Sequence, residues 1–524
     1  MSAKERIGFE WIESRLQLRP VQALRVTSSI GPARSSRESD DWRVETYPAS
    51  YRPDPSIVGH LEFGLKHEDI NLEWLSRLFA VIEPRLLEDW IRRVPAGAYA
   101  RRAGFLYEWL TTKTLDLPVV KGNFVDAIDA DKYFTRTTPS KNRRWRINDN
   151  LPGTPACCPL IRLTDALQQA ISLDIPQALA DLDQQYGANL LMRSAAWLTF
   201  NESRASFQLE REVDRKNDIR RFAAVLGTHC GSIDDPLGAS ALATIQREIL
   251  GDRALRTGLR RSPVFIGRGA HFDATHVMYI APHWDDCPAL LAGLKTFEEN
   301  TRPAASSASA SLIRAAVIAF AFVYIHPMAD GNGRIHRFLI NDTLSRDGVT
   351  PPGVILPVSS AIAGSSQNRG EYEKTLNAIS MPMMRRYAVD YRMGPPILRE
   401  DGVTSELEFD QYEDALHLWR YPDLTRHAQY VAAMIAQTIM VDMPEEAAFL
   451  ARHDEAMRRL KRIWEMPDVD AERIVRSLRE NQGTVTNLLR RDYAIVFNDP
   501  QVAREVVEAV MSALADRAQE PGPA

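Results

Sequence analysis

The sequence has few cysteines, 4 in 524 residues. None belongs to a CxxC pair, and the adjacent residues Cys157 and Cys158 are poorly placed to form a disulfide with each other. This pattern argues against a disulfide framework and a structural zinc site, and it predicts reduced thiols in a cytoplasmic protein. The start of the chain also lacks the apolar core of a signal peptide, so it gives no indication of secretion.

Long apolar runs and an excess of basic charge are absent as well. The longest apolar run, Ala315–Ile325, has 11 residues. That is too few to span a bilayer but suits a helix buried on all sides. A formal net charge of -5 gives no general attraction to nucleic acid or to an anionic membrane. We therefore expect neither a membrane nor nucleic acid as the main partner.

Common catalytic motifs and repeats are missing too. The chain has no GxxxxGK[ST] and no GxSxG, which argues against a P-loop enzyme and an α/β-hydrolase. It has no repeat of solenoid length. Its 45% hydrophobic and 25% charged residues are ordinary usage for a chain with several packed domains.

Apolar residues at helical spacing dominate the chain, so we expect a mainly α fold. Two short β-rich runs, PVFIG (263–267) and HVMYI (276–280), are separated by glycine and polar residues and predict a β-hairpin. Four regions can be separated: an N-terminal extension that is partly loop (1–60), a helical region (61–195), a region with the hairpin and the main motif (196–395), and a C-terminal helical region (396–524).

The main motif is IHPMADGNGRIHR, Ile325–Arg337. A helix that ends at its start and another that begins after GNG leave a loop whose backbone N–H groups can face one way. Such a loop at a helix N-terminus binds anions. Gly331 and Gly333 let the backbone approach phosphates without a Cβ clash, and Asn332 offers a side-chain amide donor. Phosphate is therefore the ligand that we expect.

Charged side chains beside the loop extend this chemistry. Arg334 and Arg337 lie three apart on the following helix and can grip different phosphates of one chain. Asp330 is a hard oxygen ligand suited to Mg²⁺, and His326 can remove a proton from an attacking hydroxyl. Each residue alone has an ordinary structural explanation, but their order within one short span indicates phosphate-ester chemistry on a nucleotide.

These residues carry a family resemblance. HPMADGNGRIHR resembles the signature of the Fic-domain family, His-Pro-Phe-x-Asp/Glu-Gly-Asn-Gly-Arg-x-x-Arg, with Met328 in place of phenylalanine. Methionine is a flexible apolar substitute, so we expect it to anchor the loop from beneath. RSPVFIG and VMYIAPHWDDCPALLAGLKTFEEN are similar to the family's flap and the next helix, and Tyr372 matches a frequent tyrosine. The similarity covers about 196–395 and implies a Fic-type helical core; the flanking regions resemble large bacterial Fic proteins more loosely.

The resemblance implies transfer of a nucleoside monophosphate, most often AMP from ATP, to a hydroxyl side chain of a target protein. His326 would be the general base, and Asp330 would hold Mg²⁺. Arg334 would bind the β-phosphate and Arg337 the γ-phosphate. The ATP-binding set that it implies is Gly331, Asn332, Gly333, Arg334, Arg337 and Tyr372. The target segment would pair with a flap formed by Val264, Phe265, Ile266 and Gly267.

Position 333 discriminates within the family that the chain resembles. Relatives that act as kinases have lysine there, whereas this chain has Gly333. Phosphocholine-transferring relatives carry ankyrin repeats, and none is found here. Nucleotidyl transfer is therefore favoured, and the choice between AMP, UMP and GMP stays open.

A stretch upstream bears on regulation. NESRASFQLEREVD (201–214) resembles the inhibitory helix of the family, with Ser206 and Glu210 in register and one helical turn apart on the same face. The resemblance implies that Glu210 pairs with Arg337 and occupies the γ-phosphate site. Arg211 departs from the family pattern, which has glycine or asparagine there.

Other interpretations stay open. With Glu210 present, a Fic protein can instead remove AMP from a modified target. A protein of another class would use the Fic core to recognise a partner and its C-terminal helices to bind DNA or protein. The stretch LRENQGTVTNLLRRDYAIVF (478–497) suits a helix-turn-helix, but a plain helix pair explains it as well. The target, the relieving signal and the oligomeric state are not readable from the sequence.

Overall fold

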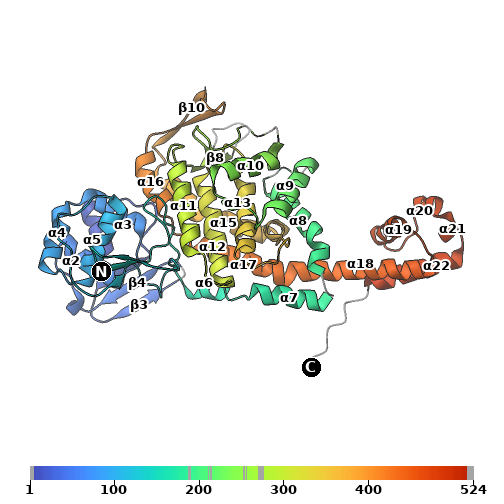
Figure 1. The fold of residues 1–524 in the computed structure, drawn as a ribbon, viewed down its shortest axis with the longest axis horizontal. Helices are drawn as coiled ribbons and strands as arrows, with labels where there is room; N and C mark the ends of the chain where they lie inside the picture. The colour runs from blue at the N-terminus through green and yellow to red at the C-terminus, as the bar shows by residue number, and fades with distance from the viewer. Residues whose placement is uncertain are drawn as a thin grey trace. The chain divides into compact units, whose positions relative to one another are not determined.

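The computed structural model describes residues 5–39, 41–186, 190–210, 212, 215–251, 254, 256–268 and 276–515. Helices dominate these residues, which confirms the predicted mainly α fold (Figure 1). The chain divides into two compact units: Met1–Pro176 with Ala195–Ala436, and Gln177–Ser194 with Gln437–Ala524.

The N-terminal part of the larger unit contains a small mixed sheet, where the sequence predicted a partly irregular extension. Its strands are β1 (Glu5–Ile7), β2 (Val26–Ile30), β3 (Ser35–Glu38) and β4 (Arg43–Tyr47). The strand order is β1-β2-β4-β3, with β2 and β4 parallel and the other pairs antiparallel. The short 3-10 helix Ala49–Tyr51 follows the sheet.

Five helices pack in this part of the unit. They are α1 (Phe9–Leu16), α2 (Ile57–His67), α3 (Leu72–Val81), α4 (Pro84–Arg93) and α5 (Ala98–Thr111). Ser56 and Asn71 cap α2 and α3, because each side chain accepts a hydrogen bond from a backbone N–H of the first turn. The helices share one apolar core, in which Trp74 is fully buried.

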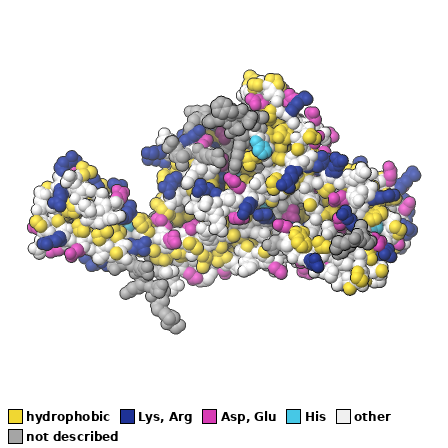
Figure 2. All heavy atoms as spheres, turned by 180° about the vertical axis from the view of Figure 1, so that it is seen from behind, with side chains coloured by type: hydrophobic (Ala, Val, Ile, Leu, Met, Phe, Trp, Pro, Cys, Tyr) yellow, Lys and Arg dark blue, Asp and Glu magenta, His cyan; other side chains and the backbone are white. Residues whose placement is uncertain are grey.

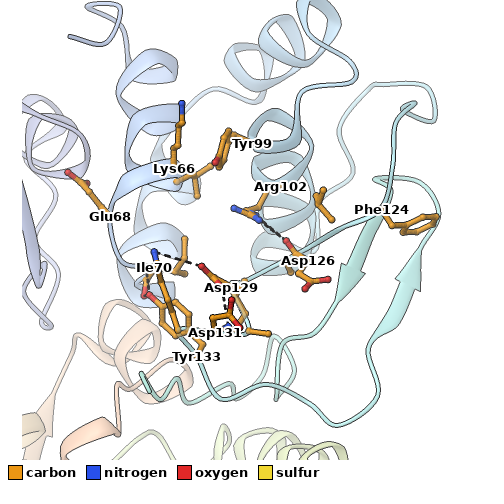
Figure 3. Close-up of a pocket in the computed structure, with 16 residues that line it drawn as sticks. Lys66, Glu68, Ile70, Tyr99, Arg102, Phe124, Asp126, Asp129, Asp131 and Tyr133 are labelled. Carbon is orange, nitrogen blue, oxygen red and sulfur yellow. Dashed lines mark hydrogen bonds and ion pairs between the residues drawn. The ribbon is translucent and has the colours of Figure 1, made fainter. Parts of the chain in front are cut away.

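The next segment is less regular than the rest of the region 61–195, which was predicted as helical. It contains the sheet β5-β7-β6, formed by Val125–Asp126, Ile147–Asp149 and Ser140–Asn142, and the helix α6 (Asp165–Ala170). A cavity of about 510 Å³ lies between this segment and the helices α2 and α5 (Figure 3). Arg102 at its wall donates to the carbonyl of Asp126 at 2.9 Å. No residue of the main motif lines this cavity, so it is no part of the predicted site.

The middle of the larger unit contains one buried apolar helix, α12 (Ala308–Ile325). Every residue from Ser311 to its end is buried, as predicted for the long apolar run. Among the described residues α12 alone is long and apolar enough to cross a membrane, yet 78% of that span is buried inside the protein. The other helices of this part are α8 (Leu190–Leu209), α9 (Lys216–His229), α10 (Ala239–Leu250), α11 (Cys287–Thr301), α13 (Asn332–Arg346), α14 (Val358–Gly364) and α15 (Ser366–Arg386).

The larger unit ends with a β-hairpin and two helices. These are β10 (Tyr391–Leu398), β11 (Thr404–Phe409), α16 (Tyr412–Arg420) and α17 (Thr425–Gln437). The region boundary that the sequence placed at residue 395 therefore falls inside β10. This hairpin was not predicted, because β10 contains a glycine and two prolines that disfavour a strand. The pairing is shifted between Met393 and Ile397, around these residues.

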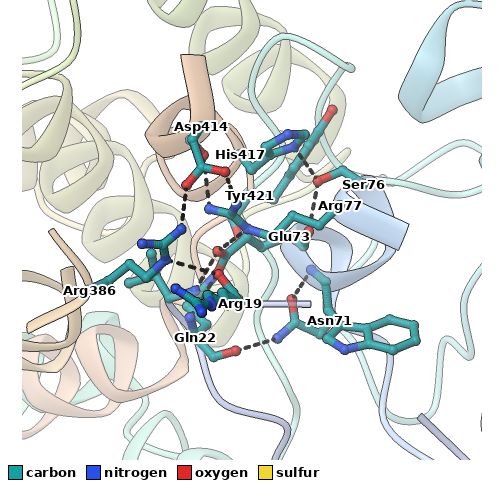
Figure 4. A network of polar contacts seen from close by, with 12 residues as sticks. Arg19, Gln22, Asn71, Glu73, Ser76, Arg77, Arg386, Asp414, His417 and Tyr421 are labelled. Carbon is teal, nitrogen blue, oxygen red and sulfur yellow. Dashed lines mark hydrogen bonds and ion pairs between the residues drawn. The ribbon is translucent and has the colours of Figure 1, made fainter. Parts of the chain in front are cut away.

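A polar network joins the N-terminal helices to this final segment (Figure 4). Arg77 of α3 donates to Glu73 at 3.0 Å and to Asp414 of α16 at 2.6 Å. The hydroxyl of Tyr387 also donates to Asp414, at 2.6 Å. The side chains of Arg77 and Glu73 are 7% and 0% exposed, so each buried charge is compensated by the other.

The smaller unit contains the remaining helices. They are α7 (Ile175–Tyr186), the π-helical turn Thr438–Asp442, α18 (Met443–Ile463), α19 (Asp468–Glu480), α20 (Asn487–Asp492), α21 (Ala494–Phe497) and α22 (Pro500–Ala515). Apolar residues of α18 to α22 form a core of their own, which includes Leu460, Ile474 and Val510. The stretch 478–497 forms the end of α19, a turn, and the short helices α20 and α21.

Charges of both signs are spread over the surface that Figure 2 shows. Lys and Arg side chains are interspersed there with Asp and Glu side chains, and hydrophobic side chains lie between them. This distribution agrees with the small formal net charge of -5.

Candidate active site

The main motif lies between α12 and α13, in the predicted order of helix, loop and helix. His326 caps the end of α12 with φ 49, and Gly331 precedes α13 with φ 88. Both angles belong to the left-handed region, where glycine has no Cβ penalty and where helices commonly end. The first N–H groups of α13 lack partners within the helix, so the loop ends at an anion-binding helix N-terminus.

The imidazole of His326 is held as a base. Its Nδ1 lies 3.1 Å from the carbonyl oxygen of Val323. Because a carbonyl oxygen only accepts, Nδ1 carries the proton and Nε2 keeps its lone pair. Burial lowers the pKa of His326 to about 4, and the nearby Arg260 cation lowers it as well. The ring is therefore neutral at pH 7.

Met328 and Asn332 hold the loop from inside. Met328 is 0% exposed, which confirms the buried anchor expected at this position. The side-chain oxygen of Asn332 accepts from the Met328 N–H at 3.0 Å, and its Nδ2 donates to the Met328 carbonyl at 2.8 Å. The amide thus closes the loop on itself. Its contact with phosphate stays a prediction, whereas this structural role was not foreseen.

Asp330 lies at the outer side of the loop, with a side chain that is 41% exposed. Its Oδ1 accepts from the N–H of Gly331 at 2.7 Å, and its carbonyl accepts from Gln246 at 2.8 Å. In the part of the chain that the structure describes, no three His, Cys, Asp or Glu residues are grouped to hold a metal. A single carboxylate fits Mg²⁺ that arrives with a nucleotide and keeps phosphate and water ligands.

Ser206 and Glu210 lie beside Arg337, as the sequence predicted. Oε1 of Glu210 accepts from Nη2 of Arg337 at 2.5 Å, and Oγ of Ser206 accepts from its Nε at 2.7 Å. The Arg337 side chain is only 3% exposed. Burial would raise the pKa of Glu210, but the charge and the hydrogen bond of Arg337, together with the charge of Arg334, outweigh it and the pKa is lowered. Both partners are therefore charged at neutral pH.

The Glu210 carboxylate also lies directly over Gly333, in the first turn of α13. A Cβ added to Gly333 would meet Oε1 of Glu210 at 2.1 Å, closer than any real contact. A Cβ at this position would displace the Glu210 carboxylate, which is the far end of a flexible side chain, from its place beside Arg337. The helix dipole favours an anion at this end of α13, so the carboxylate occupies a place that suits phosphate.

A second carboxylate, which the sequence did not single out, binds the other arginine of the motif. Glu212 forms an ion pair with Arg334 through its Oε2, while its Oε1 lies 3.3 Å from Arg215. The Arg334 side chain is 4% exposed and lies over the ring of Phe207, 4.6 Å from its centroid. Glu212 follows the end of α8, where helical spacing no longer tells which way a side chain points.

The predicted flap is present as an antiparallel hairpin of β8 (Phe265–Arg268) and β9 (His276–Ile280). The carbonyl of Val264 accepts from Ala281 at 3.0 Å, and Phe265 pairs with Ile280. Ile266 is 41% exposed, and Gly267 lies at a shift in the pairing. Residues 269–275 lie outside the described part of the chain. Pairing of a target with this flap stays a prediction.

Arg260 fixes the flap to the loop between α12 and α13, a role that no sequence signal indicated. Its guanidinium is 1% exposed and donates to the carbonyls of His326 at 2.7 Å, Ser262 at 2.9 Å and Pro282 at 2.6 Å. Ser262 precedes β8 and Pro282 follows β9, so one side chain ties both ends of the hairpin to the loop.

Tyr372 of α15 lies next to the arginine that Glu210 binds. Burial raises the pKa of its hydroxyl, and the Arg337 charge opposes that rise. Its ring centroid lies 6.3 Å from that of Phe320. A contact between Tyr372 and a nucleotide stays a prediction. The departure noted at Arg211 lies outside the described residues.

Comparisons with known proteins agree with this geometry. The model of the Fic/DOC family matches residues 236–344, which include the hairpin, α12 and the whole loop but neither Ser206 nor Glu210. Protein adenylyltransferase fic-1 of Caenorhabditis briggsae is 32% identical over 103 residues, 20% of this chain and 16% of that protein. The same figures hold for the Caenorhabditis elegans protein of that name. The chain thus matches about a sixth of the length of these curated relatives.

Solved structures of Fic proteins are similar at a low level. A Fic family protein from Desulfovibrio desulfuricans has a TM-score of 0.38 at 18% identity, covering 57% of this chain and 80% of that one. Fic-1 of Caenorhabditis elegans has a TM-score of 0.32 at 16% identity, covering 76% and 99%. The assignment to a family rests on the family match and on the loop, and not on these structural similarities. Residues 236–344 of this chain are a domain of the Fic/DOC family.

Proposed function

We propose that this chain is a protein adenylyltransferase inhibited by its own Glu210. It transfers AMP from ATP to a Ser, Thr or Tyr hydroxyl of a target protein and releases pyrophosphate. The observation that carries the proposal is the neutral His326, whose Nε2 is free to accept a proton beside the anion-binding end of α13. The names of the two curated relatives, which match over 103 residues, support the same activity.

The reaction follows from the placement of the loop. The target hydroxyl gives its proton to Nε2 of His326, and its oxygen forms a bond to the α-phosphorus of ATP. The bond between the α-phosphorus and the bridging oxygen breaks, and pyrophosphate leaves with the electron pair. The first N–H groups of α13 stabilise the charge that develops on the phosphoryl oxygens. Arg334 and Arg337 hold the β- and γ-phosphates of the leaving group.

Asp330 is the residue that would hold Mg²⁺. When bound with the nucleotide, the metal neutralises charge on the phosphate oxygens and on the departing pyrophosphate. The exposed carboxylate of Asp330 at the outer side of the loop suits this role.

The contact of Glu210 with Arg337 supports inhibition. While Glu210 occupies this guanidinium at 2.5 Å, the γ-phosphate has no cation to bind there. ATP would then lie with its α-phosphate out of line with the attacking hydroxyl. Separation of the pair would free Arg337 for the nucleotide and start the reaction.

The target would reach the site along the flap. An extended segment can add to the free edge of a two-stranded hairpin through main-chain hydrogen bonds, which places a hydroxyl near the loop without a strict sequence requirement. We place this reaction in the cytoplasm, in keeping with the cysteine usage of the chain.

Removal of AMP from a modified target is a second candidate. Glu210 and His326 share one site, because the Glu210 charge acts on the pKa of His326. A carboxylate there can position a water for attack on an AMP-bearing side chain. Transfer of UMP or GMP needs the same loop, whereas a non-catalytic binding protein would need no free base at His326.

Labelling with two forms of ATP tests the proposal. Purified protein is incubated with Mg²⁺ and ATP that carries ³²P at the α- or at the γ-position, with His326→Ala as the control. We expect covalent label from α-labelled ATP only, and none with His326→Ala. Label from the γ-position would show phosphate transfer instead. Absence of label from ATP, UTP and GTP, also with Glu210→Gly, would refute nucleotidyl transfer.

A further inference from the structure

Glu212 lies in a fixed position at the end of the inhibitory segment. Its backbone N–H donates to the carbonyl of Phe207 at 2.9 Å, which holds the residue against the last turn of α8. Its carboxylate bridges two cations, Arg334 through Oε2 and Arg215 through Oε1. Glu210 and Glu212 therefore both follow the C-terminal end of α8, but they bind different arginines.

Arg334 depends on Glu212 for charge compensation. Its side chain is 4% exposed. The carboxylate of Asp330 lies 3.8 Å away, and Glu210 acts on Arg334 through its charge without an ion pair to it. Its Nε has no hydrogen-bond partner among the described residues. A desolvated guanidinium needs an acidic partner, and Glu212 supplies the closest one.

We propose that Glu212 is a second inhibitory carboxylate, which keeps Arg334 from the phosphates of a nucleotide independently of Glu210. The inference rests on the proposed function and concerns regulation of the same site. Because each carboxylate holds its own arginine, a nucleoside triphosphate must break two ion pairs to reach the loop. Loss of Glu210 alone leaves the Arg334 site occupied, so it relieves inhibition only in part.

The independence of the two carboxylates follows from their geometry. Glu210 binds Arg337 and lies over Gly333 in the first turn of α13. Glu212 binds Arg334, whose guanidinium lies over the ring of Phe207. Neither carboxylate bonds to the other's arginine in the described part of the chain. Each should therefore be removable without breaking the other pair.

Binding of Mg²⁺-ATP, measured by calorimetry on the full chain, tests the proposal without requiring transfer. The proteins are wild type, Glu210→Gly, Glu212→Gln and the double variant. Glu212→Gln keeps the size of the side chain and removes its charge. We expect it to tighten ATP binding roughly threefold, in wild type and in Glu210→Gly alike, as for a partly exposed ion pair.

A variant without Arg334 separates the effect of the ion pair from a general effect of charge. In Arg334→Gln, the gain from Glu212→Gln should disappear, while the gain from Glu210→Gly should persist because it acts through Arg337. Glu248→Gln is the matched control, since it makes the same change at an exposed carboxylate that binds His229. It should leave ATP binding unchanged.

Three outcomes would overturn the proposal: no gain from Glu212→Gln in either background, a gain that survives in Arg334→Gln, or an equal gain from Glu248→Gln. Glu212→Ala serves as a second variant, and thermal unfolding verifies that each protein is folded. If the gains appear but no AMP is transferred, the proposed function fails and Glu212 still controls the site. If AMP is transferred and Glu212→Gln leaves ATP binding unchanged, the proposed function stands and the inhibitory role of Glu212 fails.

Discussion

The carboxylate of Glu210 lies 2.5 Å from the guanidinium of Arg337, although 127 positions separate the two residues in the chain. The same carboxylate lies over Gly333, at the end of α13 that favours anions. It thus fills part of the place that the loop offers to phosphate. Any event that withdraws α8 from α13 frees both Arg337 and the helix N-terminus.

His326 should stay neutral far below its usual pKa. Burial and the Arg260 charge lower that pKa to about 4, so the ring is neutral above this pH and gains its proton only as the pH falls through it. We expect no shift of its imidazole resonances between about pH 8 and 5.5 in NMR spectra, assigned with His326→Ala. A midpoint near 6.5 would contradict the buried, neutral base. In Glu210→Gly the pKa should be lower still, because Glu210 raises it.

Gly333→Ala should destabilise the protein only while Glu210 is present. The new methyl group would meet Oε1 of Glu210 at 2.1 Å and push this flexible carboxylate away from Arg337, and loss of such a partly exposed ion pair costs less than about 1 kcal/mol of unfolding free energy. In Glu210→Gly the cost should largely vanish, as urea denaturation would measure. Gly227→Ala in α9 is the control: its Cβ meets nothing within 4 Å, so it should stabilise by about 0.5–1 kcal/mol. Equal costs of Gly333→Ala in both backgrounds would speak against the contact.

Asn332→Ala should open the loop. It removes both hydrogen bonds to Met328 and leaves a buried N–H and a buried carbonyl without partners. We expect a loss of about 2–4 kcal/mol in unfolding free energy, together with weaker ATP binding. The control is Asn481→Ala, whose exposed amide donates to Ser477 at 2.8 Å and should cost less than about 1 kcal/mol. A small loss at Asn332 would mean that the loop keeps its shape without the amide.

Arg77→Met should loosen the N-terminal helices from the final segment of the larger unit. It leaves Glu73, which is 0% exposed, without its cation, and breaking such a buried pair costs about 3–5 kcal/mol. Arg92→Gln removes a 46% exposed guanidinium that pairs with Asp89 and Glu88 and donates to the Asp116 carbonyl, and it should cost about 1 kcal/mol or less. Chemical denaturation measures the loss of unfolding free energy in both variants. Similar values would show that the network in Figure 4 adds little stability.

The order of helix, loop and helix could be predicted because it is local. Glycines beside a helix start and arginines three apart are set by neighbouring residues, whereas the left-handed conformation of His326 was not predicted. Ser206 and Glu210 were predicted from the resemblance to the family's inhibitory helix, in which their spacing places both residues on one face. The buried anchor Met328 followed from its place in the motif.

Residues that act across the fold could not be predicted. Arg260 binds the carbonyls of Pro282 and His326, which are distant in the chain, besides that of nearby Ser262. Glu212 lies beyond the end of a helix, so no periodicity indicates its direction. The N-terminal sheet was missed because β2 pairs in parallel with β4, although β3 lies between these two strands in the chain. The role of Asn332 inside the loop depends on a side-chain orientation that residue type alone does not fix.

The central claim is that Glu210 suppresses a transfer that needs His326. Self-labelling with α-³²P-ATP and Mg²⁺ in wild type, Glu210→Gly, His326→Ala and the double variant tests it most directly. We predict weak label on wild type, label at least about tenfold stronger on Glu210→Gly, and none on either protein that lacks His326. Label on Glu210→Gly that equals wild type, although the variant binds ATP, would contradict inhibition by Glu210, and label that persists without His326 would contradict its role as the base.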